Sequence, residues 1–501
     1  MTARRKFVSD LFRDIDTSTV PDIEVFGVCL DSRLVQSGDL YLCISGYSTH
    51  GLEFVEQALA NGAVAVATDS GSLQKHPYAA DLLSRHQIPT VEVPDLKQSV
   101  GALAARFYDD PSRCLSVVAV TGTDGKTSVC RFVADALVEL NVSCGYIGTL
   151  GWGVTNALKP SALTTPDAVS LQRMLASMVD EGVHVVALEA SSHGIAEGRL
   201  DAVHVEIAVL TNLGRDHLDY HGSVEAYAAA KLKLFQKANL GCAVVNINDS
   251  LGQRIAVGDC GIDATVRRVT FSTDDSVAAN VMARNIQLNA AGIAFDLVDD
   301  THTQAVQSQL MGRFNVDNLL ACHAVLTVLG QAANDAIRAV EQVSPVLGRM
   351  ETFTGDVRPL VVVDYAHTPQ ALGAALRAVK EHCSGQLWVV FGCGGDRDPG
   401  KRASMGSVAE IADNVVVTDD NPRTEQPAHI RAQIIAGMSE PDRAIEIGDR
   451  HQAIRHAIDN AQAQDLILVA GKGHEDYQIV GEQRLIFSDR IAVQELLEEA
   501  C

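Results

Sequence analysis

The sequence predicts an α/β protein with mostly parallel sheets. Two observations lead to this prediction: the apolar runs of the chain and the helical patterns that follow them. Eight short apolar runs, rich in β-branched residues, end in polar residues or Gly, and a helical pattern often follows them. Continuous apolar runs suit strands that are buried on both faces, as in parallel sheets covered by helices. The runs are SVVAVT, VVALE, IAVLT, AVVNI, LVVVD, LWVVF, NVVV and LILVA. In such sheets ligands bind beyond the carboxyl ends of the strands, so the polar residues there are the candidates for function.

The domain organisation follows from changes of pattern along the chain. With 501 residues the chain is long enough for roughly two to four domains. Residues 1–94 contain short strands, a helical stretch, a glycine and another strand, which indicates a smaller α/β domain. A helical stretch then leads into the first apolar run, and a helix-rich stretch gives way to strands near residue 345. We therefore predict domains at 1–94, 95–344 and 345–501.

The composition excludes some classes of protein. The chain is 47% hydrophobic and 21% charged, which is typical of a soluble globular protein with buried cores. The formal net charge of -23 argues against a nucleic-acid partner, because affinity for phosphate backbones depends on clustered Lys and Arg. The chain shows no apolar signal core, no run long enough to span a membrane, and no CxxC spacing among its eleven cysteines. These features predict a cytoplasmic protein with reduced thiols and no membrane partner.

The first apolar run ends in a glycine-rich loop, VVAVTGTDGKTSVCRF, that resembles a phosphate-binding P-loop. Gly122 and Gly125 let backbone N–H groups approach phosphate oxygens, and the helix that follows favours an anion at its N-terminus. Lys126 can reach the β- and γ-phosphates, and Thr127 can bind Mg²⁺. The strict P-loop pattern has Gly where this chain has Val120.

Two further strand ends carry groups suited to a metal or a phosphate. Glu189 and His193 lie in LEASSHG, and His217 lies in TNLGRDHLDYHG. A lone histidine is more often a satisfied polar residue than a ligand, but two such clusters after a P-loop favour a site. Glu189 is a plausible ligand for a hard cation such as Mg²⁺. Lys231, in EAYAAAKLKLF, reads from the pattern alone as part of a solvated helix face.

The third group of candidate residues follows residue 345. It lies in GRME, DYAHTP, FGCGGDRDPGKR, VVVTDDNPRTE and AGKGHED. In DDNPR, Asn, Asp and Pro explain a tight turn after a strand, but no turn requires Arg423. A guanidinium held between carboxylates suggests recognition of a charged ligand.

In chain order the motifs are TGTDGKT, LEASSHG, TNLGRDHLDYH, AAAK, GRFNVDN, GRME, DYAHTP, FGCGGDRDPGKR, DDNPR and GKGHEDYQ. This series resembles the Mur ligase family, and with LDSR and GDLYLCISG near the start the resemblance covers nearly the whole chain. The loop variant TGTDGKT is found in that family and in folylpolyglutamate synthases. The combination is far more specific than any single motif.

The resemblance implies three domains: a small N-terminal α/β domain that binds UDP, a central P-loop domain with a mostly parallel sheet, and a C-terminal Rossmann-like domain. It implies an ATP-dependent ligase of peptidoglycan synthesis, most similar to those that add meso-2,6-diaminopimelate to UDP-N-acetylmuramoyl-L-alanyl-D-glutamate. An acyl phosphate would be the intermediate, and Mg²⁺ the cofactor. Small molecules are the expected partners, and a monomer the expected form.

The resemblance also assigns roles to residues, motif by motif. It places ATP at Gly122, Thr123, Asp124, Gly125, Lys126 and Thr127, with Asn315 and Asp364 near the adenosine. It places Mg²⁺ near Thr127, Glu189, His217 and Lys231, a lysine that the family carries as a carbamate. It assigns the UDP-MurNAc-dipeptide to Leu30, Ser32, Tyr47, Ser48, Thr49, Thr164, Thr165, Ser192 and Arg199. It assigns diaminopimelate to Arg397, Asp420, Asn421, Pro422, Arg423, Gly471 and Glu475. The implied catalytic residues are Lys126, Glu189, His217, Lys231 and Arg349.

Two departures from the family pattern and two rival functions remain. Some members carry Asn at the position of Leu163 and Gln at that of Glu197. A folylpolyglutamate synthase would share the P-loop and the ligase chemistry, but LDSR and DNPR argue against it. A regulatory NTPase would not need GRME, DYAHTP and GKGHED after its P-loop domain.

Overall fold

The structure, a computed structural model, describes residues 4–17, 20–46, 49–299, 302–354 and 358–499. Contacts between residues divide the chain into two compact units. The first consists of residues 1–270 with 324–330, and the second of residues 271–323 with 331–501.

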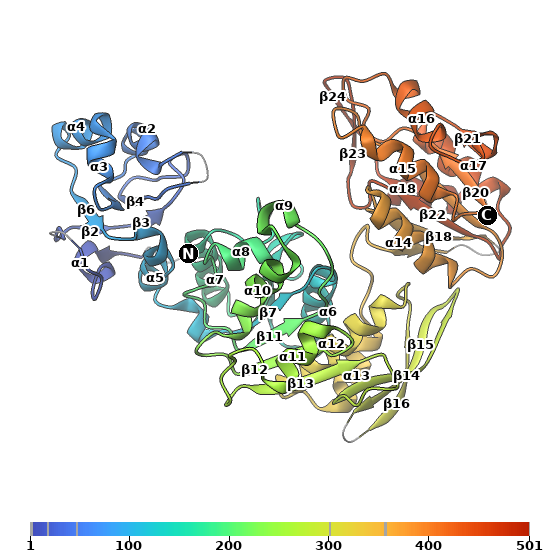
Figure 1. Cartoon of the computed structure of the whole chain (residues 1–501), viewed down its shortest axis with the longest axis horizontal. Coiled ribbons are helices and arrows are strands. Elements are labelled where there is room, and N and C mark those ends of the chain that lie inside the picture. Colours follow the sequence, from blue (N-terminus) through green and yellow to red (C-terminus); the bar gives the residue numbers. More distant parts are fainter. Residues whose placement is uncertain (1–3, 18–19, 47–48, 300–301, 355–357, 500–501) are drawn as a thin grey trace. The chain divides into compact units, whose positions relative to one another are not determined.

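The first unit begins with a small sheet that is buried on both faces. Its four parallel strands are ordered β3-β4-β5-β6. Along β4, Leu40 and Leu42 join one apolar core while Tyr41 and Cys43 join another, because successive side chains point to opposite faces. The strands are β3 (Gly27–Cys29), β4 (Asp39–Cys43), β5 (Ala65–Asp69) and β6 (Thr90–Val93), beside a short pair β1 (Lys6–Phe7) and β2 (Glu24–Val25). The helices are α1 (Val8–Leu11), α2 (Val55–Ala60), α3 (Ser72–Lys75), α4 (Pro77–Arg85) and α5 (Leu96–Phe107), with short 3₁₀ turns at Gly51–Phe54 and Pro111–Cys114 (Figure 1).

A second sheet of the first unit carries the glycine-rich loop. Its strand order in this unit is β12-β11-β7-β10-β8-β9, and all neighbours are parallel except β8 and β9. The strands are β7 (Ser116–Thr121), β8 (Cys144–Gly148), β9 (Gly151–Val154), β10 (Val185–Glu189), β11 (Ile207–Leu210) and β12 (Cys242–Asn246). The helices are α6 (Lys126–Glu139), α7 (Ala168–Asp180), α8 (Ser192–Ala196), α9 (Leu218–His221), α10 (Val224–Phe235) and α11 (Ser250–Val257). Because β7 lies between β10 and β11, the three strand ends that carry polar motifs are neighbours.

The second unit contains antiparallel strands that the apolar runs did not predict. β14 (Val281–Asn289) pairs with β15 (Gly292–Asp299), and β15 pairs with β16 (Thr303–Ser308). The end of β13 (Arg267–Ser272) pairs in parallel with β14. Two helices follow, α12 (Phe314–Val328), which contributes residues to both units, and α13 (Ala333–Glu341).

The rest of the second unit is a three-layer domain. Its six-stranded sheet has the order β17-β18-β22-β19-β20-β21, with only the β17–β18 pair antiparallel. The strands are β17 (Glu351–Phe353), β18 (Leu360–Asp364), β19 (Leu387–Phe391), β20 (Asn414–Val417), β21 (Ala444–Glu446) and β22 (Leu466–Ala470), and a separate hairpin joins β23 (Tyr477–Val480) to β24 (Gln483–Ile486). The helices are α14 (Pro369–Lys380), α15 (Gly400–Ala409), α16 (Pro427–Ile435), α17 (Arg450–Asn460) and α18 (Asp489–Glu498), with a 3₁₀ turn at Pro441–Arg443. One core gathers residues of α14, α15 and α16, and the other residues of α17 and α18.

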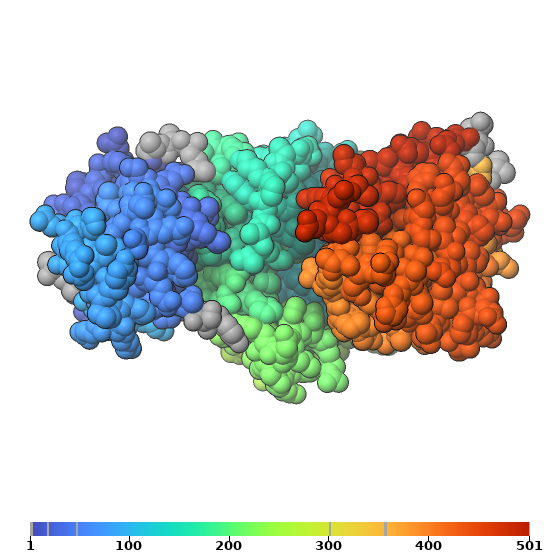
Figure 2. Space-filling view, turned by 90° about the horizontal axis from the view of Figure 1, so that it is seen from above, coloured from blue at the N-terminus to red at the C-terminus, as the bar shows by residue number. Residues whose placement is uncertain are grey.

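The predicted fold class is confirmed. All eight apolar runs are strands, at β7, β10, β11, β12, β18, β19, β20 and β22, and each has a parallel neighbour. The predicted boundaries near residues 94 and 345 fall between elements, after β6 and after α13, and they stay predictions. In the part of the chain that the structure describes, no helix combines the length and apolar character needed to cross a bilayer. The space-filling view shows the first and last parts of the chain, in blue and in orange to red, each with a closely packed surface (Figure 2).

A buried ion pair ties the helix layer of the last domain to its sheet. Arg450, the first residue of α17, donates to both oxygens of Asp489, the first residue of α18, at 2.7 and 2.8 Å, and neither side chain is exposed. The same guanidinium donates to the carbonyl of Ala470 at 2.9 Å and lies 3.4 Å from that of Asp419. The pair therefore anchors the backbone just beyond β20 and at the end of β22.

We predict that Asp489→Asn destabilises this domain by about 3–5 kcal/mol, because Arg450 would remain buried without its counter-charge. The matched control is Glu499→Gln, which breaks the pair between Arg455 in α17 and Glu499, the residue after α18. That pair is partly exposed and should contribute only about 0–1 kcal/mol. Urea unfolding followed by the fluorescence of Trp388, in β19, compares the two variants. Equal, small losses would contradict the structural role of the buried pair.

Candidate active site

The glycine-rich loop connects β7 to α6, and the side chain of the lysine that follows it donates hydrogen bonds to the loop backbone. Gly122 has a φ of 155°, and a Cβ there would lie 1.8 Å from Thr211 Oγ1, so no larger residue fits. Lys126 opens the helix, and its Nζ donates to the carbonyls of Gly122 at 2.9 Å and Thr123 at 2.7 Å. Burial lowers the pKa of the Lys126 ammonium. The loop thus presents a helix N-terminus and a buried cation, the two features that bind phosphate.

At the end of the neighbouring strand, the Glu189 carboxylate accepts hydrogen bonds from several residues. Glu189 terminates β10, is fully buried, and accepts hydrogen bonds from Thr127 Oγ1 at 2.9 Å and from the N–H and hydroxyl of Thr149 at 3.0 and 3.1 Å. Tyr146 donates a further short bond to the same carboxylate. Sequence reasoning missed Tyr146 and Thr149, because the glycine-containing run CGYIGT does not resemble a continuous apolar strand.

Lys231 corrects an expectation from the sequence. The pattern alone placed it on a solvated helix face, but its side chain is buried at 1% exposure, and that interpretation is wrong. Its Nζ donates to the Gly122 carbonyl at 2.7 Å and lies 4.3 Å from the centre of the Tyr227 ring. Burial, and secondly the Lys126 ammonium, lower the pKa of Lys231 from 10.5 to about 7. Near neutral pH a large share of this buried amine is therefore uncharged.

A polar chain runs from Glu189 towards α8. Thr165 Oγ1 lies 2.7 Å from the Glu189 carbonyl and 2.9 Å from Ser191 Oγ. Thr164 is 3.0 Å from Thr149, hydroxyl to hydroxyl. Arg199 donates to the Thr165 carbonyl at 2.6 Å. The predicted dipeptide residues thus lie beside the predicted metal ligand.

The two sequence positions that depart from the family pattern differ in their surroundings. Glu197 accepts from Arg199 Nε at 2.9 Å, so it holds the guanidinium in place. Leu163 is 48% exposed.

Three histidines pack against one another rather than around a metal position. The rings of His193 and His217 are 4.7 Å apart, and His221 lies 3.1 Å from Ser192 Oγ through its Nε2. Burial lowers the pKa of both His193 and His221, which favours their neutral forms. Within the described ranges, no three His, Cys, Asp or Glu side chains are grouped as a metal site would need. Only two of the four predicted metal ligands are of these types, so this result does not test that set.

In the first domain the predicted nucleotide contacts are spread over two loops. Leu30 is half-buried against the core, and Ser32 Oγ donates to Gln57 Oε1 at 2.7 Å. Thr49 is exposed and its carbonyl accepts from Gly46 N at 2.8 Å. The predicted residues Tyr47 and Ser48 lie outside the described residues.

The second unit gathers four charged or amide side chains after β20 and β22. Lys472 has no exposed side-chain surface, and its Nζ lies 3.2 Å from Asn421 Oδ1, 3.3 Å from Glu475 Oε2 and 3.9 Å from Asp420 Oδ1. Asn421 Nδ2 donates to Glu475 at 3.1 Å. Gly471, with a φ of 118°, lets Asp420 approach, since a Cβ there would lie 2.8 Å from Asp420 Oδ2.

Arg423 stands next to this network without a carboxylate of its own. Its backbone takes a φ of 50° and pairs with β23 through Ile479, so the turn is held by the hairpin. Its Nη1 donates to the Gly395 carbonyl at 2.7 Å. Across the described residues no ion pair involves Arg423 or the exposed Arg397. Pro422 lies between Asn421 and Arg423, and the Pro422 backbone faces Gly395.

The residues assigned to the nucleoside and to phosphate charge also lie in the second unit. Both oxygens of Asp364 accept backbone N–H groups, from Met350 at 2.9 Å and Ala366 at 2.8 Å. Arg349 lies over the Tyr365 ring, 4.9 Å from its centre. Asn315 donates to the Met311 carbonyl at 2.8 Å. These contacts fix the side chains, and their roles stay predictions.

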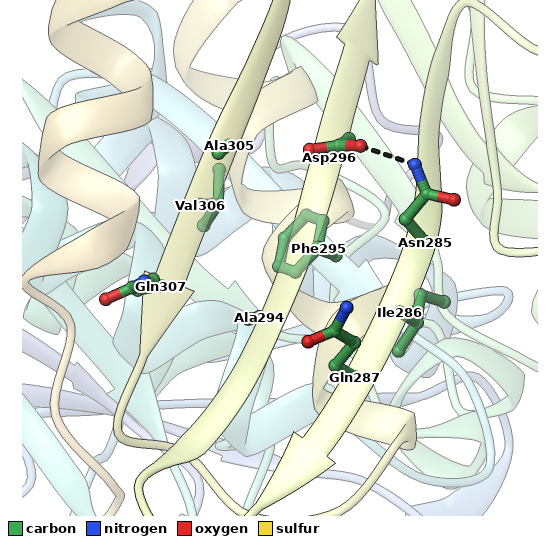
Figure 3. A pocket seen from close by; sticks show the side chains of 9 residues that line it. All are labelled: Asn285, Ile286, Gln287, Ala294, Phe295, Asp296, Ala305, Val306 and Gln307. Atoms are coloured by element: carbon green, nitrogen blue, oxygen red, sulfur yellow. Dashed lines mark hydrogen bonds between the residues drawn. The ribbon is translucent and has the colours of Figure 1, made fainter.

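A hollow of about 510 Å³ lies away from these residues, on β14, β15 and β16 (Figure 3). Asn285 donates to Asp296 across it at 2.6 Å, and the other lining side chains are short, apolar or amide. None of the predicted site residues lines it.

Comparison with known proteins identifies the family. Residues 24–108 match the model described as Mur ligase family, catalytic domain, residues 120–326 the Mur ligase middle domain, and residues 348–473 the Mur ligase, glutamate ligase domain. The chain is 44% identical to UDP-N-acetylmuramoyl-L-alanyl-D-glutamate--2,6-diaminopimelate ligase of Pseudomonas putida over 472 residues, 93% of this chain and 94% of that protein. This chain belongs to the Mur ligase family.

Solved structures agree with this membership. A structure of UDP-N-acetylmuramoyl-L-alanyl-D-glutamate--2,6-diaminopimelate ligase matches 99% of both chains with a TM-score of 0.76 and 35% identity. A folylpolyglutamate synthase of Mycobacterium tuberculosis shares the fold over 75% of this Mur ligase and 92% of its own chain, with a TM-score of 0.58 and 19% identity.

The depressed pKa of Lys231 predicts a pH effect on stability. Below pH 7 the lysine is protonated in both the folded and the unfolded protein. Between about pH 7 and 10 only the unfolded chain keeps the proton, so the free energy of unfolding should rise by roughly 1.4 kcal/mol per pH unit from this group. Lys231→Met lacks this contribution. Urea unfolding of the first unit, followed by Trp152 fluorescence in buffer without divalent cations or bicarbonate, compares the two proteins. Parallel pH profiles would contradict the shift.

Proposed function

We propose that this Mur ligase uses ATP to join meso-2,6-diaminopimelate to UDP-N-acetylmuramoyl-L-alanyl-D-glutamate, giving the UDP-MurNAc-tripeptide, ADP and phosphate. The names of the P. putida relative and of the solved structure support this specificity. The feature of the chain that carries the proposed specificity is Arg423, a guanidinium without a carboxylate partner, held beside the Asp420–Lys472–Glu475 network.

We also propose that the ligase works in the cytoplasm as a monomer on small-molecule substrates. Its UDP-binding, ATP-binding and amino-acid-binding domains would be residues 1–94, 95–344 and 345–501.

The chemistry must overcome two obstacles. A carboxylate is a poor electrophile, and it must approach a second anion, the γ-phosphate of ATP. Transfer of the γ-phosphoryl group to the D-glutamyl γ-carboxylate gives an acyl phosphate. The amino group of diaminopimelate then attacks the carbonyl, and the tetrahedral intermediate expels phosphate to leave the amide. Exclusion of water protects the acyl phosphate from hydrolysis.

The loop after β7 holds the nucleotide phosphates in this proposal. Residues Gly122 to Thr127 offer N–H groups and the Lys126 ammonium, which already lies over the loop carbonyls. Asn315 and Asp364 are proposed to contact the adenosine. Arg349, held against Tyr365 and free of an ion pair among the described residues, is proposed to neutralise charge on the transferred phosphoryl group.

The residues at the start of α6 and the end of β10 fit a magnesium ion. Mg²⁺ takes oxygen ligands and uses few protein groups besides substrate phosphate, and the Thr127 hydroxyl and the Glu189 carboxylate supply such oxygens. When bound, the ion would screen the charge of the phosphates. His217, at the edge of the histidine stack, is proposed to lie near it.

Lys231 fits a carbamate at this position. An ammonium would repel a cation, whereas a carbamate adds two oxygens. Carbamate forms when the uncharged amine attacks CO₂ and releases a proton. With a pKa of about 7, Lys231 has this reactive form available at neutral pH.

The two other substrates are proposed to occupy the remaining strand ends. Leu30, Ser32 and the 47–49 loop would bind the uridine nucleotide, and the MurNAc-dipeptide would contact Thr164, Thr165, Ser192 and Arg199. Of these last four, Arg199 donates to the Thr165 carbonyl, and Thr165 donates to the Glu189 carbonyl. Diaminopimelate would contact Arg397, Asp420 to Arg423, Gly471 and Glu475.

Phosphate release tests the proposed function. ATP with both UDP-MurNAc-L-Ala-D-Glu and meso-diaminopimelate should release phosphate in step with tripeptide formation. Omission of either substrate should reduce release to background. Release from ATP alone at the same rate would indicate an NTPase, and ligation of glutamate to a folate would indicate a folylpolyglutamate synthase.

Arg423 should determine use of the distal carboxylate. In Arg423→Ala the substrate loses a bidentate charged pair, which costs roughly 2–5 kcal/mol, or about 30-fold to a few thousand-fold in kcat/KM for diaminopimelate. Lysine lacks the distal carboxylate, so its weak use should hardly fall, and the KM for ATP should change little. Arg423→Lys should recover part of the loss, because a point charge cannot reproduce the guanidinium fork. Equal losses for diaminopimelate and lysine would mean that Arg423 supports the fold or the shared head group.

A further inference from the structure

Lys472 has no role in the proposed function, yet it is the most enclosed member of the network after β22. Its side chain has no exposed surface, while those of Asp420 and Glu475 are 10% and 18% exposed. A buried lysine is costly unless its charge is paired. Here the ammonium contacts one amide oxygen and two carboxylates, all from residues proposed to bind the amino acid.

The charges around this network can be counted because the neighbouring ions are already paired. Arg450 is neutralised by Asp489, and Asp419 pairs with Arg431. Arg397, which is also proposed to contact diaminopimelate, is exposed, so solvent screens its charge. The less exposed charged groups at the site are the carboxylates of Asp420 and Glu475 and the cations Lys472 and Arg423. We call these four residues the distal-end set. Their formal charges cancel.

The distal end of diaminopimelate is also neutral overall, because it carries one ammonium and one carboxylate. The distal end of lysine carries one ammonium and no carboxylate, so its formal charge is +1. Without Lys472 the distal-end set would carry a formal charge of -1, which matches lysine better than a zwitterion. In a poorly solvated site one unmatched charge is enough to discriminate between such substrates.

We propose that Lys472 is a specificity-determining residue, whose buried ammonium sets the distal-end set to a formal charge of zero and so matches it to a zwitterionic substrate end. This proposal rests on the proposed function. Lys472 acts as a positioning and charge-balancing residue in it, since its buried ammonium contacts both Asn421 and Glu475, while Arg423 donates to the Gly395 carbonyl.

The test compares three amino acids that differ only at the distal end: meso-diaminopimelate (neutral), lysine (+1) and 2-aminopimelate (-1). In Lys472→Met the ratio of kcat/KM for diaminopimelate to that for lysine should fall by roughly tenfold or more, the size expected for coupled neighbouring charges. The KM for ATP should stay near the wild-type value. Lys472→Arg keeps the charge and should retain most of the preference.

A second variant changes the charge of the distal-end set in the opposite direction, and it tests the proposal even if Lys472→Met fails to fold. Glu475→Gln gives the distal-end set a charge of +1, so the preference should shift towards 2-aminopimelate. The matched control is Lys380→Met, which removes a surface ammonium of α14 that donates to the Ile411 carbonyl. It should leave all three ratios unchanged.

The outcomes separate the inference from the proposed function. If the wild-type ligase does not use diaminopimelate, the proposed function is wrong and the inference falls with it. If it does, and both charge-changing variants lose the three amino acids in equal proportion, Lys472 is only structural and the inference alone is overturned. Opposite shifts in Lys472→Met and Glu475→Gln support it.

Discussion

Two buried lysine side chains meet at one backbone carbonyl, and the geometry of the glycine-rich loop depends on that contact. Lys126 and Lys231 both donate to the carbonyl of Gly122, at 2.9 and 2.7 Å. Burial disfavours the charged form of Lys231, and the nearby Lys126 ammonium disfavours it further, so the pKa of Lys231 falls to about 7. Gly122 can bring its carbonyl there only because it lacks a Cβ that would collide with Thr211. The loop, the helix α10 and the reactivity of Lys231 therefore depend on one another.

In the second unit, unlike the first, the buried cations are paired with carboxylates. There each buried cation has a carboxylate close by: Arg450 has Asp489, and Lys472 has Glu475 and Asp420. Paired charges inside a protein fix geometry more than they add stability, since desolvation offsets much of the attraction. Arg423, by contrast, bonds to a carbonyl and takes part in no ion pair among the described residues, as its proposed contact with a charged ligand requires. In the proposed function, this contrast between paired and unpaired charges gives the site its specificity.

The sequence predicted the strands and their functional ends better than the contacts of single side chains. Each apolar run was recognisable because a strand covered on both faces needs continuous apolar residues, and the residue after it falls at the site edge. Lys231 was misread from the pattern because its burial depends on the packing of α10 against Gly122, 109 residues earlier in the chain. Thr149 and Tyr146 escaped for a similar reason: β8 contains two glycines and carries no continuous apolar run. The antiparallel strands β14 to β16 alternate polar and apolar residues and end in no motif, so nothing in them pointed to function.

The central claim is that this Mur ligase activates a carboxylate as an acyl phosphate before the amine attacks. Transfer of an isotope from the substrate to phosphate tests it most directly. With ¹⁸O in the D-glutamyl γ-carboxylate of UDP-MurNAc-L-Ala-D-Glu, the oxygen that bridges to phosphorus leaves with the phosphate when the amide forms. ³¹P NMR of the released phosphate, in a reaction with ATP and meso-diaminopimelate, should show one ¹⁸O per tripeptide made. Tripeptide formed together with phosphate that contains no ¹⁸O, so that the oxygen lost from the carboxylate leaves in water instead, would contradict the account.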